Sequence, residues 1–259
     1  MNAFPIYGLT DLGVLLKFDS ATPGTLDATI PIFGLGAGER IIGMDFRPAD
    51  SLLYCVTVTA AGVGRLYKLD KVSGVASGAM TLTADLADST APYSSLSGNH
   101  YGVNFNPVVD RLRIVSDNGA NLRVNPALGT VFTDTNLNPG SPVIVGVSYS
   151  NPFAGATATS LYDIEPLSDS LLTQEPANSG ALSNIGSFGL DIGDLVGFEV
   201  TMQSGANLGY ASFTNFGTTS LYTVGLGNGL ATLVGAIDTS PALIGLSISS
   251  DEIFRTGFE

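Results

Sequence analysis

The sequence lacks tryptophan altogether and contains a single cysteine and a single histidine in 259 residues. Cys55 cannot form an internal disulfide, and its apolar neighbours in LLYCVTV indicate a buried, unreactive thiol. One histidine, His100, cannot build a zinc site from several histidines, and a Ser-His-Asp triad would depend on it alone. We therefore expect a structural role for His100. Without tryptophan, the chain also lacks a strong platform for stacking on sugars.

Basic residues are scarce, with 10 Lys and Arg against 23 Asp and Glu and a net charge of −13. Such a surface repels phosphate backbones and anionic lipids, so we expect no nucleic-acid partner. No apolar run approaches the ~18 residues of a membrane span, which argues against membrane insertion. The start MNAFPIYGLT lacks the basic and long apolar regions of a signal peptide. Because the low charge and many Ser, Thr, Gly and Asn are compatible with export, we interpret the chain as an already processed, secreted protein.

What the sequence does contain is a repeat, in which Gly, an apolar residue, a small or acidic polar residue and another apolar residue recur. The motif reads GMDF at 43, GVNF at 102, GVSY at 146, GFEV at 197 and GLSI at 245. Three further short apolar stretches follow each of the first four copies, separated by turn residues. Four short strands in each unit of about fifty residues are typical of a propeller blade.

The fifth unit is divided between the two ends of the chain. LIGLSISS near the C-terminus supplies one strand, and FPIYGLT, GVLLKFD and LDATIPI near the N-terminus match the other three. Joining them closes a ring and removes exposed sheet edges. The sequence therefore predicts an all-β, five-bladed β-propeller with four-stranded antiparallel blades. Residues 1–250 would form this single domain, with residues 251–259 as a C-terminal tail.

A tight hairpin is predicted within GVNFNPVVDRLRIVSDNGANLRVN, which spans residues 102–125. Asn118 and Gly119 tolerate the positive φ that such turns need. A three-residue loop would place Ile114 opposite Val124.

The same stretch holds Arg111, Arg113 and Arg123, three of the ten basic residues. Strand alternation is expected to send Arg113 and Arg123 to one packed face and Arg111 elsewhere. A guanidinium in a packed face needs acceptors, and Asp110 and Asp117 are the carboxylates close in sequence. We interpret the cluster as structural ion pairing between blades, and a site for an anionic ligand is the alternative.

The stretch GVNFNPVVDRLRIVSDNGANLRVNPALGTVFTD and the later TSLYDIEPLSDSLLTQEPANSGALSNIGSFGLD resemble an uncharacterised bacterial domain-of-unknown-function family of secreted, propeller-like proteins. The resemblance covers most of the chain and implies the fold and export. It implies no activity.

Other candidate sites carry weaker signals. Asp134, Asn136 and Asn138 alternate as in a calcium loop, but Val145 stands where a bidentate glutamate is needed, so a solvated turn is favoured over Ca²⁺. Asp45 and Glu199 occupy the variable polar position of the repeat and are the candidates for a channel site that binds a ligand or performs glycosidase-like chemistry. The Gly-rich GLGAGERIIG and GLGNGLATLVG fit neither dinucleotide nor phosphate loops, so no cofactor is expected.

These observations favour a non-enzymatic, exported structural protein that assembles with itself into a layer, matrix or filament. The tail DEIFRTGFE adds a strand-like piece for which a closed ring has no place, and Ile253, Phe254 and Phe258 could bury their side chains on a neighbouring copy. The alternatives are a module that binds glycans or other small ligands at the channel mouth and, less favoured, a hydrolase or lyase.

Overall fold

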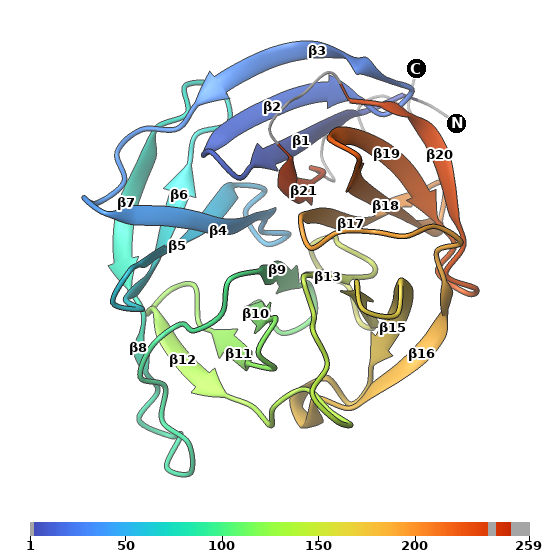
Figure 1. The fold of residues 1–259 in the computed structure, drawn as a ribbon. Helices are drawn as coiled ribbons and strands as arrows, with labels where there is room; N and C mark the ends of the chain where they lie inside the picture. The colour runs from blue at the N-terminus through green and yellow to red at the C-terminus, as the bar shows by residue number, and fades with distance from the viewer. Residues whose placement is uncertain (1–2, 238–241, 250–259) are drawn as a thin grey trace.

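The computed structural model describes residues 3–237 and 242–249, and Figure 1 shows their strands as five small sheets around a central axis. This confirms the predicted five-bladed propeller. No helix in this part of the chain could span a membrane, and its helical element is the three-residue 3₁₀ turn η1 (Ala177–Ser179).

The blades are numbered here in chain order. Blade 1 contains β21 (Leu243–Ser247), β1 (Pro5–Thr10), β2 (Val14–Asp19) and β3 (Thr22–Pro31). Blade 2 contains β4 (Glu39–Phe46), β5 (Leu53–Thr59), β6 (Gly64–Leu69) and β7 (Ala76–Thr81). Blade 3 contains β9 (Tyr101–Asn106), β10 (Arg111–Ser116), β11 (Asn121–Val124), β12 (Thr130–Thr133) and the added parallel strand β8 (Thr83–Ala84). Blade 4 contains β13 (Gly146–Tyr149), β14 (Leu161–Glu165), β15 (Ser170–Gln174) and β16 (Leu182–Ser187). Blade 5 contains β17 (Val196–Gln203), β18 (Ala206–Asn215), β19 (Thr218–Val224) and β20 (Ala231–Ala236).

Blade 1 closes the ring as predicted, because the C-terminal β21 pairs antiparallel with the N-terminal β1. Tyr7 lies opposite Ser247, and Leu9 lies opposite Gly245. The chain ends are thus held in one sheet. The predicted tail, residues 251–259, lies outside the described residues, and its role stays a prediction.

The glycines of the repeat lie on the innermost strands β4, β9, β13, β17 and β21, where neighbouring blades approach most closely. A Cβ atom added at Gly43 would come within 2.5 Å of Val103 on the next inner strand, and one at Gly102 within 2.7 Å of the Val147 nitrogen. Only glycine allows such an approach. A comparable approach recurs at Gly197 but not at Gly245, so the sequence period of about fifty residues reflects this contact at several positions around the axis.

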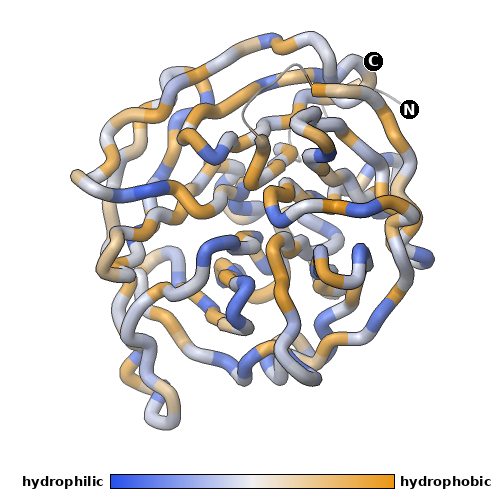
Figure 2. The backbone as a smooth tube through the Cα atoms, viewed as in Figure 1, coloured by the Kyte–Doolittle hydropathy of each residue, from blue (hydrophilic) through white to orange (hydrophobic). Residues whose placement is uncertain are grey.

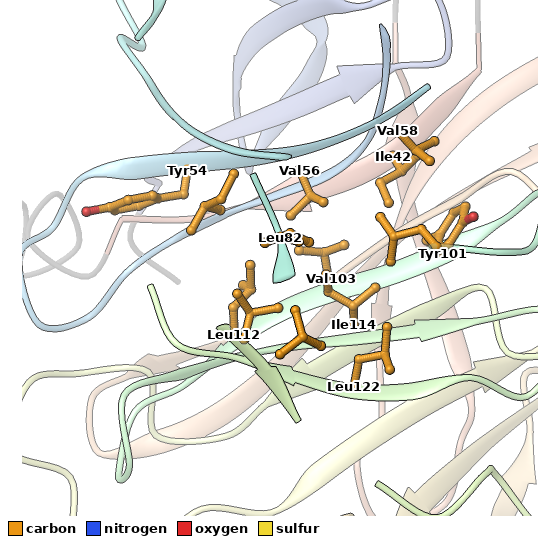
Figure 3. Close-up of a cluster of buried hydrophobic side chains, with 14 of the residues drawn as sticks. Ile42, Tyr54, Val56, Val58, Leu82, Tyr101, Val103, Leu112, Ile114 and Leu122 are labelled. Atoms are coloured by element: carbon orange, nitrogen blue, oxygen red, sulfur yellow. The ribbon is translucent and has the colours of Figure 1, made fainter. Parts of the chain in front are cut away.

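The hydrophobic core is divided into five clusters, each lying between two neighbouring blades. Figure 2 accordingly shows apolar residues on the strands of every blade. Between blades 2 and 3, Figure 3 shows Tyr54 and Val56 facing Val103 and Leu112. The cluster between blades 3 and 4 is the smallest, with seven buried members. Polar side chains beside this cluster, described below, join the two blades by hydrogen bonds.

The hairpin of blade 3 differs in register from the prediction. Ile114 lies opposite Leu122, and Leu112 lies opposite Val124, so the pairing is shifted by two residues. The loop has the expected three residues but lies one position earlier, at 117–119, because the Ser116 amide bonds to the Ala120 carbonyl and the Gly119 amide bonds to the Ser116 carbonyl. A shift by two preserves which side chains share a face.

Candidate functional site

At the axis, the variable polar residues of the repeat form a buried group, called here the axial ring: Asp45, Asn104, Ser148, Glu199 and Ser247. Four of the five accept a hydrogen bond from a backbone amide of the next blade. The Phe46 amide donates to Ser247 Oγ at 3.0 Å, the Phe105 amide to Asp45 Oδ2 at 2.7 Å, the Tyr149 amide to Asn104 Oδ1 at 2.8 Å and the Val200 amide to Ser148 Oγ at 2.8 Å. These side chains fasten blade to blade.

The two acids of the axial ring are both protected from water. Ser247 Oγ donates to Asp45 Oδ1 at 2.8 Å, and Asn104 Nδ2 donates to Glu199 Oε2 at 3.1 Å. Burial raises the pKa of Asp45 to about 7. Burial, and then the charge of Asp45, raise the pKa of Glu199 well above its ordinary value.

The predicted channel site is not supported by this arrangement. The cavity enclosed by the starts of the inner strands measures about 10 Å³, the space of about one water molecule. Asp45 is bonded to the two neighbouring blades, through Phe105 and Ser247, and Glu199 reaches across the axis to Asn104 of blade 3. Charged residues on an innermost strand can therefore have a structural role. Their position in the sequence does not tell this role from ligand binding.

The weak calcium candidate is not supported either, because Asp134 already binds two arginines. Its carboxylate accepts from Arg113 Nη1 at 2.7 Å and from Arg123 Nε at 2.6 Å. Asn138 Nδ2 donates to the Asn136 and Ser179 carbonyls, which holds the loop together. Within residues 3–237 and 242–249, no three acidic, cysteine or histidine side chains gather as a metal site would require.

The three arginines converge on one cavity of about 410 Å³ between blades 3 and 4, called here the arginine cleft. The expectation that Arg111 lies elsewhere is wrong. Arg111 and Arg113 are two residues apart on β10 and so point to the same face, and Arg113 lies directly opposite Arg123 on β11. The cleft is lined by Asn106, Val109 and the arginines from blade 3, and by Tyr149, Thr159, Leu161 and residues 175–178 from blade 4.

Arg113 forms the floor of the cleft and is 2% exposed. Its guanidinium donates to the Tyr149 hydroxyl at 3.2 Å, Asn121 Oδ1 at 2.7 Å and Asn178 Oδ1 at 2.8 Å, besides Asp134. Two partners come from blade 3 and two from blade 4. Arg113 therefore joins the blades where their apolar cluster is smallest, and positions the cleft walls.

The carboxylates predicted as partners of these arginines have other roles. Asp110 forms a bidentate pair with Arg47 of blade 2, with Nε to Oδ1 at 2.8 Å, and this pair lowers the pKa of Asp110. Asp117 accepts hydrogen bonds from the Asn99 and His100 amides at 3.0 and 3.2 Å. Asp110 does join two blades, but through an arginine that the sequence interpretation did not select.

Arg111 differs from the other two arginines because none of the described carboxylates lies within ion-pair distance of it. Its Nη1 donates to the Asp110 carbonyl at 2.9 Å and lies 3.4 Å from the Val109 carbonyl. Arg123 is 28% exposed and stacks on Phe132 with its guanidinium carbon 4.9 Å from the ring centre. Both side chains thus bring guanidinium groups to the open part of the cleft.

Two other cavities have less distinctive chemistry. One of about 190 Å³, near the starts of the inner strands, combines Asp11 and Asp194 with Arg40 and His100. Another of about 610 Å³, between blades 2 and 3, is lined mainly by small residues, with Glu39 and Arg40 as its charged members. No catalytic constellation is evident among the residues that the structure describes. The arginine cleft is therefore the strongest candidate for a functional site.

Fold and site together define the class: a five-bladed propeller with a hydrogen-bonded, closed axis and a basic cleft between two blades. The model of a domain of unknown function, DUF4394, matches residues 14–247, and the chain belongs to this family. The match confirms the predicted resemblance to an uncharacterised family, while bacterial origin and export stay predictions. No curated protein matches the chain.

Two solved structures are similar in fold. One chain of a crystal structure of a nidogen–laminin complex has a TM-score of 0.51 at 14% identity, with 95% of this chain and 98% of that chain covered. A protein assigned as a 6-phosphogluconolactonase, from Bacteroides uniformis, has a TM-score of 0.41 at 16% identity, with 90% and 67% covered. At these identities the first likeness concerns the fold alone, and the second is too distant to bear on function.

Proposed function

We propose that this protein is an exported, non-catalytic binding module that holds an anionic ligand in the arginine cleft. The observation that carries the proposal is the convergence of three of the chain's ten basic residues on one cavity, in a protein of net charge −13. Random placement of so few cations on an acidic surface would not concentrate the local positive potential in this way. The cavity volume of about 410 Å³ lies in the range of small-ligand sites.

The arginines have different roles, and this difference supports ligand binding. Arg113 has its hydrogen bonds satisfied inside the protein and gives rigidity. Within the described residues, Arg111 donates to carbonyl oxygens and forms no ion pair. Its remaining N–H groups can therefore donate to an anion without breaking an ion pair. A site of this kind is preorganised, because the protein fixes its cationic wall before the ligand arrives.

Arg111→Gln is expected to weaken binding of sulfate and acetate by at least about tenfold, since a hydrogen bond to a charged group contributes ~1.5–3 kcal/mol. Titration calorimetry of the full chain measures this loss. Arg40→Gln is the control, because Arg40 also donates to two backbone carbonyls but lies outside the cleft; it is exposed, whereas Arg111 is half-buried. Absence of saturable binding, or an equal loss in both variants, would disprove the proposal.

Self-assembly is a second candidate function, favoured by exposed apolar residues at the rim. Phe33 and Val75 are 58% and 46% exposed, and they form a parallel bridge between the segment after β3 and the residue before β7. Two such adjacent side chains offer a contact for another copy. The predicted tail residues Ile253, Phe254 and Phe258 would add to it.

A chain ending at Ser250 is expected to remain a folded monomer that no longer associates. Each Phe side chain buried between copies would contribute roughly 1.5–3 kcal/mol, so losing two would remove most of a small contact. Light scattering and electron microscopy of both chain lengths measure the outcome. If the shortened chain forms the same assemblies, the tail has no such role, and if it unfolds, the tail belongs to its own ring.

A further inference from the structure

We propose that the ligand of the arginine cleft is a sugar acid of the uronate type, with one carboxylate on a hydroxylated ring. This inference rests on the proposed function and makes it more specific. It follows from the charge balance of the cleft, from the difference between its two walls, and from its partly apolar lining.

The charge balance favours a ligand with a single negative charge. Arg111, Arg113 and Arg123 contribute three positive charges, and the carboxylates of Asp134 and Glu175 offset two of them. Asp163 of β14 does not line the cleft, neither of its oxygens is hydrogen-bonded within the described chain, and burial raises its pKa well above the ordinary value, which disfavours its charged form. One unit of positive charge is left for one carboxylate, and a doubly charged phosphate monoester would exceed it.

The wall from blade 4 suits hydroxyl groups instead of a second charge. Glu175 is exposed at the cleft and presents acceptor oxygens. Asn178 gives its carbonyl oxygen to Arg113, which leaves its amide nitrogen to donate. Hydroxyls both donate and accept, so a polyol can satisfy Glu175 and Asn178 together. A simple anion such as acetate has no donor for Glu175.

Between these polar walls, the lining includes Val109, Leu161 and Pro176. Such side chains can pack against the C–H face of a sugar ring and remove it from water. The chain has no tryptophan for this purpose, so aliphatic contact would replace stacking on an indole. Carboxylate, hydroxyls and an apolar ring face occur together in a uronate.

The test compares glucuronate with glucose, acetate, glycine and inorganic phosphate by calorimetric titration of the full chain. Glucuronate is expected to bind at least tenfold more tightly than each of the other four. Arg111→Gln should weaken both glucuronate and acetate. Glu175→Gln removes one negative charge from the cleft and should strengthen acetate, whereas glucuronate should gain clearly less than acetate, because only the sugar donates hydroxyls to this side chain.

Glu165→Gln provides the control, since Glu165 is a partly exposed acid of blade 4 that does not line the cleft. If acetate or phosphate binds as tightly as glucuronate, the sugar-acid inference is overturned while anion binding stands. Tightest binding of glycine would indicate an amino-acid ligand and also overturn it. If no anion binds in saturable fashion, both this inference and the proposed function fall.

Discussion

Replacing Arg113 with alanine is expected to lower the free energy of unfolding by about 3–5 kcal/mol, because it removes a buried guanidinium with its four hydrogen-bond partners, although Arg123 still pairs with Asp134. Arg113 is 2% exposed, and the carboxylate side chain that it pairs with, on Asp134, is 4% exposed. The substitution also leaves Asn178 Oδ1 without its donor, removes one of the two donors to Asn121 Oδ1, and opens a cavity at the smallest apolar contact between blades.

Thermal unfolding measures this effect, because about 3–5 kcal/mol corresponds to a fall in Tm of roughly 6–20 °C for a domain of this size. Arg111→Ala is the matched control. It lies two residues earlier on the same face of β10, but it meets only carbonyl oxygens, so its loss should change stability by less than about 0.5 kcal/mol. Equal stability of the Arg113 variant and wild type would show that the buried network does not join the blades.

The ring was predictable because its physical causes are local and repeated. Glycine is required by a close approach of inner strands at Gly43, Gly102 and Gly197, so the same structural demand left similar marks in several units, although Gly245 has ordinary van der Waals room. Ring closure was predictable for a related reason. A unit with only its first strand at the C-terminus needs the three N-terminal strands to avoid open edges.

The cleft was less predictable because its partners are distant in sequence. Arg113 and Asn178 are 65 residues apart, and their contact depends on how two blades pack, which no strand pattern encodes. The sequence nearby offered Asp110 and Asp117, whereas Asp134 is the carboxylate that packing brings to Arg113. Period-two alternation, applied correctly to β10, would have placed Arg111 beside Arg113. The sequence could therefore predict that the arginines share a face, but it could not predict the cavity that they line.

The axial ring leads to the second large expected effect, a loss of stability as pH rises. Burial raises the pKa of Asp45 from 3.8 to about 7, and the pKa of Glu199 is also raised. For such groups the stabilising contribution is complete below the unfolded-state pKa and is lost as pH rises through the folded-state pKa. Between about pH 4 and 7, Asp45 alone would cost about 4 kcal/mol, at 1.36 kcal/mol for each pKa unit.

Glu199→Gln is expected to raise the free energy of unfolding at pH 8 and to flatten its decline with pH. Glutamine resembles the protonated glutamic acid and retains an oxygen to accept from Asn104 Nδ2. As pH rises, Asp45 is then the one acid of the axial ring that must ionise, because residue 199 no longer carries a carboxyl group. Urea unfolding at pH 5, 6, 7 and 8 measures the difference, which should grow as pH rises.

The control for this experiment must remove the same charge from the surface, because a chain of net charge −13 also gains stability when general repulsion falls. Asp27→Asn does so at an exposed position of β3. A rise in stability at pH 8 that is clearly larger in the Glu199 variant than in the Asp27 variant would assign the effect to the axis. Equal changes in the two variants would contradict it, because the buried carboxyl would then behave like an ordinary surface charge.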